Sequence, residues 1–153
     1  MAAAGKRHGY NSQLKYDSDG AGAGAVTLSE LCKFKAPKVT RAKVDGTNLE
    51  STDTHKEYLP AAGWFDTDEA TFDVWFTDTQ LGTLITLADA GTEKYFYHML
   101  PLASGQATRP QLKYKGYIAS YEVQEVDKDS DEPIRCTFTI QRTSGKITYT
   151  AGA

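Results

Sequence analysis

The sequence predicts a mainly β protein, a β-sandwich or barrel with one flanking α-helix. Aromatic residues are plentiful, with nine Tyr, six Phe and two Trp in 153 residues, and aromatic and β-branched side chains suit pleated, half-buried strands. Apolar and polar residues alternate along several segments, as expected of strands with one buried face. Helical spacing of apolar residues is convincing only in residues 78–90. A chain of this length also suits one core and one domain.

The first 25 residues are predicted to form a flexible N-terminal arm (1–25), and residues 26–153 the β-sandwich domain. Small residues run from Gly20 to Ala25, and such a segment buries too little apolar surface to order itself. Three larger side chains interrupt the arm: Tyr10, Leu14 and Tyr16. The hypothesis is that they order the arm only when it lies across a neighbouring copy of the chain.

The next segments have the pattern of strands on either side of a long connection. Cys32 and Phe34 share one face of a strand that Pro37 ends, because proline cannot donate to a sheet ladder. Residues 39–44 continue extended. The polar stretch that follows, to about Lys56, is too long for a tight hairpin. Long ordered loops usually exist to contact something.

Further strands are expected along the rest of the chain. They cover residues 58–65, 70–76, 94–100, 112–126, 134–141 and, as a shorter candidate, 146–150. The segment 112–126 is long beside the usual five or six residues of a strand. A strand of that length overhangs a small sandwich, so we expect it to share a sheet with other copies.

Residues 78–90 are predicted to form a helix that packs on a sheet. Thr77 and Gln80 have the spacing of a capping box, and Gly91 stands where a left-handed C-terminal residue is favoured. The predicted core face of the helix consists of the residues whose spacing stacks them on one side: Leu81, Leu84, Ile85 and Ala88.

The charge balance argues against sequence-wide binding of nucleic acid. Seventeen basic and twenty acidic side chains leave a formal charge of -3, too little positive charge to neutralise many phosphates. No apolar run is long enough for a membrane span, and residues 1–7 lead into polar sequence without the apolar core of a signal peptide. The protein is expected to bind no membrane and to stay in the cytoplasm where it is made. Cys32 and Cys136 are expected to be buried thiols there.

No catalytic, cofactor-binding or metal-binding residue is predicted. Asp127, Asp129 and Asp131 alternate like the start of a calcium loop, but the sixth and twelfth positions lack the required Gly and Glu. The three His residues are isolated from one another and from paired Cys. The acids at residues 66–69 could serve acid–base chemistry, yet no supporting constellation accompanies them. The enzyme class therefore ranks last.

Charge is distributed unevenly along the chain. Residues 44–93 contain eleven Asp or Glu and one basic residue, Lys56, whereas residues 33–43 contain five Lys or Arg and no acid. Two interpretations stay open. The charges could form solvated faces, or basic and acidic faces of successive copies could meet. The second kind of contact is heterologous, and it must close into a ring or continue as a filament.

Several short motifs follow one another along residues 26–150. They are Val44-Asp45-Gly46-Thr47-Asn48 with Ser51, Glu57-Tyr58-Leu59-Pro60 through Gly63, Gln80-Leu81-Gly82, Gly116-Tyr117-Ile118-Ala119, and Phe138-Thr139-Ile140 through Ser144-Gly145. Their order and spacing resemble the major tail tube protein family of long-tailed, non-contractile bacteriophages, the siphophages. The Gly/Ala-rich N-terminal extension departs from the family's pattern.

The resemblance implies a structural, non-enzymatic protein of the virion tail. It implies a tail tube β-sandwich domain, six copies per ring, and stacked rings whose inner barrel takes four strands from each copy. The implied partners are a tape measure protein, a tail terminator and distal tail or baseplate proteins, with assembly in the host bacterial cytoplasm. Genomic DNA would pass along the bore during ejection without specific binding. Six chains at -3 give 6 × -3 = -18 per ring, which would repel DNA if some of that charge faces the bore.

In such proteins a long loop, here residues 40–63, reaches the adjacent ring. The residues so implied as the inter-ring contact loop are Arg41, Lys43, Asp45, Thr47, Asn48, Glu50, Asp53 and Glu57. The N-terminal arm, with Tyr10, Leu14 and Tyr16, and the C-terminal tail are implied to contact neighbouring rings as well.

Two alternatives stay open. The tube subunit of a contractile tail or of a type VI secretion system shares the ring architecture, and a sheath protein in the same particle would identify it. A monomeric β-barrel that holds a small apolar ligand would also suit the many Tyr and Phe residues, and its mass in solution would identify it.

Overall fold

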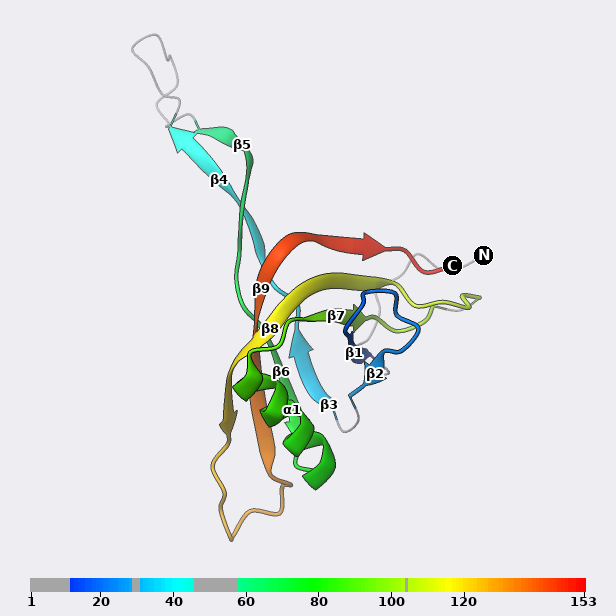
Figure 1. The fold of residues 1–153 in the computed structure, drawn as a ribbon, viewed down its shortest axis with the longest axis vertical. Helices are drawn as coiled ribbons and strands as arrows, with labels where there is room; N and C mark the ends of the chain where they lie inside the picture. Colours follow the sequence, from blue (N-terminus) through cyan, green and yellow to red (C-terminus); the bar gives the residue numbers. More distant parts are fainter. Residues whose placement is uncertain (1–11, 29–30, 46–57, 104) are drawn as a thin grey trace.

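The computed structural model describes residues 12–28, 31–45, 58–103 and 105–153. They form nine strands and one helix in the order β1 (Gln13–Asp17), β2 (Val26–Thr27), β3 (Leu31–Lys35), β4 (Val39–Asp45), β5 (Tyr58–Thr67), β6 (Ala70–Trp75), α1 (Asp78–Ala90), β7 (Lys94–Met99), β8 (Gln111–Val123) and β9 (Arg135–Thr150). The predicted fold class is confirmed, because the described chain is mostly antiparallel β-sheet with one flanking helix (Figure 1).

Seven strands form one antiparallel sheet, and two form a separate ribbon. The order in the sheet is β2-β1-β7-β8-β9-β6-β3, and β4 pairs with β5. In Figure 1 the β4–β5 ribbon projects from the body of the molecule, on the side away from the turn that joins β8 to β9. The described chain therefore has a compact body and one projecting ribbon, β4–β5.

The long strands β8 and β9 belong to two layers. Residues 111–116 of β8 pair with both β7 and β9, whereas residues 117–123 pair only with the start of β9, which pairs in turn with β6. Figure 1 shows both strands curving through this change. Layer 1 comprises β2, β1, β7, residues 111–116 of β8 and residues 141–150 of β9; layer 2 comprises residues 117–123 of β8, residues 135–140 of β9, β6 and β3.

Gly116 lies at the bend, where β8 and β9 approach closely. A Cβ atom at this position would stand 2.5 Å from the carbonyl oxygen of Gln141, so glycine is required for the close approach of the two backbones. The β8–β9 register shifts at three places between residues 113 and 120, as expected of bulges that bend a strand. The sequence predicts two strands, 134–141 and 146–150, where the structure has the single β9. The reason is that β8 offers a ladder partner on both sides of the bend.

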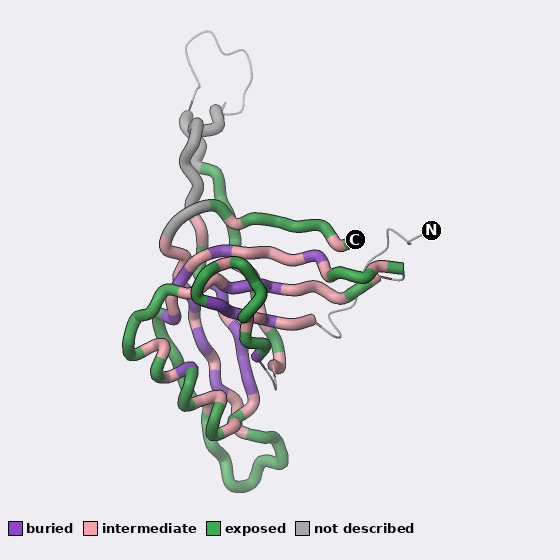
Figure 2. The backbone as a smooth tube through the Cα atoms, turned by 45° about the vertical axis from the view of Figure 1, so that its right-hand side comes forward, coloured by how far each residue is buried: buried purple, intermediate pink, exposed green. Residues whose placement is uncertain are grey.

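Aromatic and branched side chains fill the space between the layers. Phe72 and Phe138 stack with ring centroids 5.2 Å apart, and Phe96 and Tyr114 stack at 5.9 Å. Cys136 is buried beside them, and burial raises the pKa of its thiol, which confirms its prediction as a core residue. Figure 2 shows the buried positions concentrated in the body, while the β8–β9 turn is exposed.

The helix α1 begins and ends where the sequence predicts, and it packs against the core. Leu84 is buried, and Leu81 and Ala88 are partly buried against the core. Ile85, the remaining residue of the predicted face, is half-buried. Leu87 also packs against the core, although the predicted face omits it. The covered stripe is therefore rotated slightly from the predicted one.

The two ends of α1 differ in how their backbone groups are satisfied. Gly91 has a φ of 61°, and its N–H donates to the carbonyl oxygen of Ala88 at 3.2 Å, as predicted for a left-handed C-cap. The predicted capping box is not formed, because the hydroxyl of Thr77 makes no cap hydrogen bond and its Oγ1 is buried without a partner. In the described parts of the chain, no helix is long and apolar enough to cross a membrane.

The N-terminal segment contradicts the predicted arm from residue 13 onward. β1 pairs with β7 along its whole length, and Leu14 and Tyr16 are 0% and 7% exposed. The prediction that these two side chains become ordered only against a neighbouring copy is therefore wrong, since both lie in the core of their own subunit. Their alternation with Gln13 and Lys15 suits a strand with one buried face, which adds to the edge of β7. Tyr10 lies outside the described residues.

Candidate assembly surfaces

Within the described residues, layer 2 is a four-stranded sheet whose two outermost strands are each paired along one edge. On one side, residues 117–123 of β8 pair with β9 after β7 has ended opposite Gly116. On the other side, β3 pairs with β6. Such edges carry backbone groups that can hydrogen-bond a further strand. Layer 1 has such an edge on one side only, where residues 142–150 of β9 pair with β8 alone, because the strand at its other edge, β2, has two residues. Layer 2 thus offers an edge of useful length on both sides.

The β8 edge of layer 2 also leaves core-facing apolar side chains incompletely covered. Tyr121 and Val123 pair with Phe138 and Cys136 and face the same side, yet they are 42% and 47% exposed. The Tyr121 ring stacks on that of Phe138 with centroids 6.0 Å apart. Apolar side chains that continue the core to an open sheet edge form a surface that a second copy can cover.

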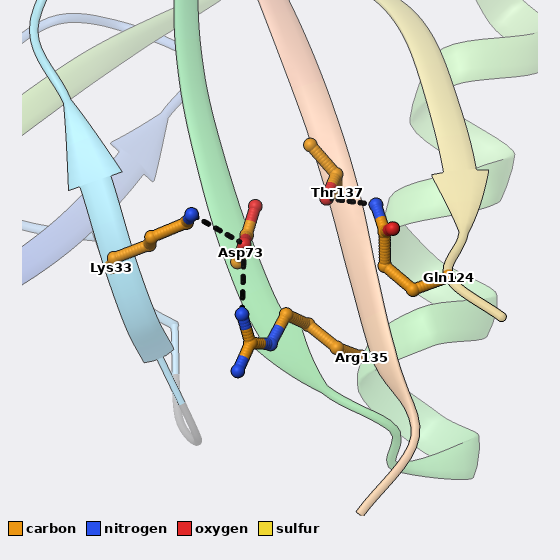
Figure 3. Close-up of polar contacts among 5 residues, drawn as sticks. All are labelled: Lys33, Asp73, Gln124, Arg135 and Thr137. Carbon is orange, nitrogen blue, oxygen red and sulfur yellow. Dashed lines mark hydrogen bonds and ion pairs between the residues drawn. The ribbon is translucent and has the colours of Figure 1, made fainter. Parts of the chain in front are cut away.

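The outward face of layer 2, opposite the core, carries a charged cluster that spans three strands (Figure 3). Asp73 on β6 is 5% exposed. Its Oδ2 lies 3.5 Å from Nζ of Lys33 on β3 and 3.8 Å from Nη1 of Arg135 on β9. A carboxylate covered to this degree needs compensating charge. The Lys33 and Arg135 side chains are 71% and 34% exposed, so water screens both pairs. The cluster therefore sets local charge more than it adds stability.

Neighbouring side chains hold this cluster against the sheet. The guanidinium of Arg135 lies over the ring of Trp75, 5.0 Å from its centroid, a cation–π contact that fixes the cation on the surface. Beside it, Gln124 Nε2 donates to Thr137 Oγ1 at 2.8 Å (Figure 3). Arg135, Gln124 and Thr137 also line a hollow of about 450 Å³. The face thus presents hydrogen-bonding groups and paired charges.

The outward face of layer 1 is basic. Its groove, of about 890 Å³, is lined by Tyr95 and Tyr97 together with Lys15, Lys113, Lys115 and Lys146. Nζ of Lys113 lies 5.1 Å from the centroid of Tyr95 and donates to the carbonyl oxygen of Gly20. Nζ of Lys115 lies 3.2 Å from Oε2 of Glu93. Lys113 therefore meets aromatic rings and a carbonyl group, and Lys115 meets a carboxylate.

Asp17 holds the segment that borders this groove, residues 18–25, which we call the strap. Its carboxylate accepts hydrogen bonds from the N–H of Gly20 at 2.9 Å, the N–H of Gly22 at 2.7 Å and the hydroxyl of Tyr97 at 3.0 Å. Gly20 and Gly22 have φ values of 75° and 81°, which glycine adopts without strain. Burial and the neighbouring Asp17 raise the pKa of Tyr97, so the phenol stays a donor. The strap is thus fixed to layer 1.

His98 lies where side chains join the two layers. It is fully buried, its Nε2 lies 2.8 Å from the hydroxyl of Tyr114, and its ring contacts Phe34 of β3 with centroids 5.0 Å apart. Burial lowers the pKa of His98 to about 4, so the imidazole is neutral at pH 7. The side chain is a packing residue of the core. Across the described ranges, no group of three or more His, Cys, Asp or Glu is placed to hold a metal ion.

The predicted inter-ring contact residues fall on the ribbon and on its connection. Arg41 is exposed near the base of β4, and the backbones of Lys43 and Asp45 pair with Pro60 and Tyr58 of β5. The predicted loop 40–63 is thus in large part a two-stranded ribbon. The remaining predicted residues lie outside the described ones: Thr47, Asn48, Glu50, Asp53 and Glu57.

Comparison with known proteins rests on structure, because no protein-family profile and no curated protein matches the sequence. The 6-fold symmetrised baseplate of the anti-feeding prophage contains a chain that matches with a TM-score of 0.73 and 6% identity, over 99% of this chain and 98% of that one. The tail of the empty gene transfer agent particle, with C6 symmetry, matches with a TM-score of 0.71 and 18% identity, over 95% and 100%. The SPP1 tail tube matches with a TM-score of 0.69 and 11% identity, over 95% and 80%.

These likenesses define the class of fold. Identities this low show a shared fold, and the matches cover almost the whole of this chain. The resemblance expected from the motifs is therefore confirmed at the level of the fold: the chain has the fold of phage tail tube proteins. A type six secretion system protein also matches, with a TM-score of 0.52 and 13% identity, over 90% of this chain and 82% of that one.

Sequence reasoning missed both the Asp73 cluster and the strap. Alternation alone places Asp73 outward, between the buried Phe72 and Val74, but it does not give the strand order that brings Lys33 and Arg135 to its two sides. For the strap a local signal existed. Asp17 is followed by Gly20 and Gly22, and Asp and Gly are among the residues that dominate turns.

Proposed function

We propose that this protein is the subunit of the tail tube of a long-tailed bacteriophage. Hexameric rings of it stack into a hollow tube, and genomic DNA passes through the tube into the host during ejection. The observation that carries the proposal is layer 2, a four-stranded sheet with an open edge on both sides, in a chain with the tail tube fold. The role is structural, without catalysis or a cofactor.

In the proposed ring, residues 117–123 of β8 in one copy lie beside β3 of the next copy. The half-exposed Tyr121 and Val123 are then covered, and the open edges of layer 2 are removed. The contact joins two different edges, so it closes only after a fixed number of copies. Six is the proposed number, by analogy with the C6 tail of similar fold. The predicted donor strand, 112–126, shrinks to 117–123, because residues 111–116 already pair on both sides.

The β4–β5 ribbon is the proposed contact between stacked rings. It projects from the body (Figure 1), and an isolated two-stranded ribbon is marginal in water unless it packs on something. The proposed contact residues are those predicted from the sequence: Arg41, Lys43, Asp45, Thr47, Asn48, Glu50, Asp53 and Glu57. Two basic residues, Arg41 and Lys43, come first among them and four acidic ones follow, and this separation of charge suits contact with a second copy.

The proposed place of the protein is the virion tail, after assembly in the host bacterial cytoplasm. A tape measure protein occupies the bore during assembly, a terminator closes one end, and distal tail or baseplate proteins hold the other. DNA passes without specific binding, and the chain binds no membrane. The support is the fold shared with tails of phage-like particles.

The tube subunit of a contractile tail or of a type VI secretion system is the second candidate. The anti-feeding prophage baseplate and the type six secretion system protein among the structural matches favour it. A sheath protein around the tube in the native particle would identify this case. A monomeric ligand-binding barrel is disfavoured, since Phe72, Tyr114 and Phe138 occupy the space between the layers.

Electron microscopy of the purified full-length chain tests the proposal. Rings or tubes with sixfold symmetry are expected, alone or with a distal tail protein added to start assembly. Val123→Lys places a charge on the β8 edge and should abolish tubes, whereas Val126→Lys, at a position that is 64% exposed beyond the strand, should leave them intact. Wild-type protein that stays monomeric at every salt concentration and with the partner present would contradict the proposal.

A further inference from the structure

We propose that Asp73 masks two cations of the bore surface, Lys33 and Arg135, so that DNA phosphates meet these two already paired with a carboxylate. The inference rests on the proposed tube. In a ring closed through both edges of layer 2, one face of this sheet lies toward the axis. Layer 1 and α1 cover the other face, so the outward face with the Asp73 cluster is the one that lines the bore.

The strands of this face do not carry the acidic excess of the chain, although Glu125, Asp127 and Glu132 of the β8–β9 turn line the hollow beside the cluster. The charged residues on the strands of the face, as far as the structure describes them, are Lys33, Lys35, Asp73, Glu122 and Arg135. Cations outnumber acids in this set, so the net charge of the whole chain is a poor guide to the strands that line the bore. Repulsion of DNA by a strongly acidic bore, which the net charge of -3 predicts, finds no support in these residues.

The geometry of the cluster limits how its cations can meet a phosphate. Arg135 lies between the ring of Trp75 and the carboxylate of Asp73, so its guanidinium is held on the sheet. Lys33 reaches the same carboxylate oxygen from the opposite strand (Figure 3). Asp73 is itself 5% exposed and fixed in the middle of the sheet, so it stays in place when a polyanion approaches. Any phosphate must therefore compete with it for both cations.

Masking matters because free cations bind DNA through counterion release. The salt slope is the steepness with which the logarithm of the binding constant falls as the logarithm of the salt concentration rises. Each phosphate contacted adds about 0.7 to this slope for a single strand and about 0.9 for a duplex. A subunit repeated around each ring and along each stacked ring multiplies even a weak contact. Free lysines and arginines on the bore would therefore retain DNA. A carboxylate shared between two cations weakens their binding to phosphates, so DNA can slide past them.

The test is the binding of a short fluorescein-labelled single-stranded DNA to assembled tubes, followed by co-sedimentation over a range of salt. Asp73→Asn keeps the side-chain shape and frees both cations. The expected result is binding at least about threefold tighter at low salt, with a salt slope steeper by about 0.7 for each phosphate that gains a contact. Asp73→Asn tubes with the same affinity and the same salt slope as wild-type tubes would overturn the inference.

Matched variants separate charge masking from general effects. Asp89→Asn makes the same change in net charge at an exposed position on α1 and should leave DNA binding unchanged. The double variant Asp73→Asn/Arg135→Gln leaves Lys33 as the one freed cation of the pair, so its binding should fall between that of Asp73→Asn and that of the wild type. Increased binding by Asp89→Asn, or binding by the double variant as tight as that of Asp73→Asn, would overturn the inference.

A surface variant covers the case in which Asp73→Asn fails to assemble. The Lys33 side chain is 71% exposed, so Lys33→Gln should fold. If Lys33 is masked, its loss should change DNA binding by less than about twofold, whereas a free phosphate contact would cost several-fold at low salt. A several-fold loss would overturn the inference. A wild-type chain that forms no tubes at all is a separate outcome, and it counts against the proposed function.

Discussion

The outward faces of the two layers use the same residue types in opposite ways. On layer 1, Asp17 turns its carboxylate to backbone N–H groups of the strap, and lysines such as Lys113 lie over aromatic rings. On layer 2, Asp73 turns its carboxylate to Lys33 and Arg135. The first face stays basic, and the second is nearly balanced. The groups that pair with a buried carboxylate, more than the number of charged residues, therefore decide whether a face is basic or nearly neutral.

The two layers are joined at two places, a backbone seam on one side and an aromatic seam on the other, and the two seams differ. On one side the backbones of β8 and β9 pass from layer to layer and bend at Gly116. On the other side the layers meet through side chains, with Phe34 against His98 and His98 on Tyr114. A close backbone crossing leaves no room for added atoms, whereas a packed aromatic seam responds to protonation. Substitutions and a change of pH test both differences.

The largest effect is expected at the backbone seam. Gly116→Val should lower the free energy of unfolding by about 3 kcal/mol or more, because its Cβ would stand 2.5 Å from the carbonyl oxygen of Gln141 and the strands must separate. Urea unfolding measures the change. Gly24→Val is the control, since nothing lies within 4 Å of a Cβ at that position, and its effect should stay within about 0.5 kcal/mol. Similar effects at both glycines would contradict the close crossing.

The aromatic seam should make stability depend on pH. The pKa of His98 is about 4 in the folded chain and 6.5 ordinarily, so the unfolded chain binds more protons between these values and stability falls as pH drops from 6.5 toward 4. The loss is at most about 3 kcal/mol at 1.36 kcal/mol per pKa unit. Urea unfolding at pH 7 and pH 5 measures it. His98→Asn should flatten this part of the profile, and an unchanged slope in that variant would show that other groups cause it.

The strap should depend on Asp17. Asp17→Ala removes an acceptor of three hydrogen bonds and should cost about 2 kcal/mol, with faster hydrogen exchange at the amides of Gly20 and Gly22. The neighbouring Asp19→Ala is the control, because Asp19 accepts one exposed hydrogen bond, from the N–H of Ala21. That variant should lose less than about 0.5 kcal/mol. Equal losses would mean that Asp17 does not hold the strap.

The smallest effect on stability is expected at Asp73. Asp73→Asn should cost about 1 kcal/mol, because both cations of the cluster reach water when their partner is lost. Asp73 is as covered as Asp17, at 5% against 6% exposed, so the two substitutions compare the two faces directly in urea unfolding. A loss at Asp73 as large as that at Asp17 would show that the cluster acts mainly as a structural support.

The sequence by itself determined the parts of the fold that depend on local periodicity. The bounds of α1, its left-handed end at Gly91 and the inward alternation around Phe138 all follow from residues within a few positions of one another. Side chains repeat every 3.6 residues on a helix and every second residue on a strand. A local window therefore carries that information. The order of short motifs also pointed to the tail tube fold, which the structural matches confirm.

Only the tertiary structure decided which distant segments lie side by side. Residues 13–17 become a strand because β7 offers an edge, and β9 continues as one strand because β8 accompanies it through the bend. Asp73 becomes a paired carboxylate only because the strand order places β3 and β9 beside β6. Pairing between segments far apart in the chain is fixed by burial of a shared core, and the composition and spacing of any one segment do not contain it.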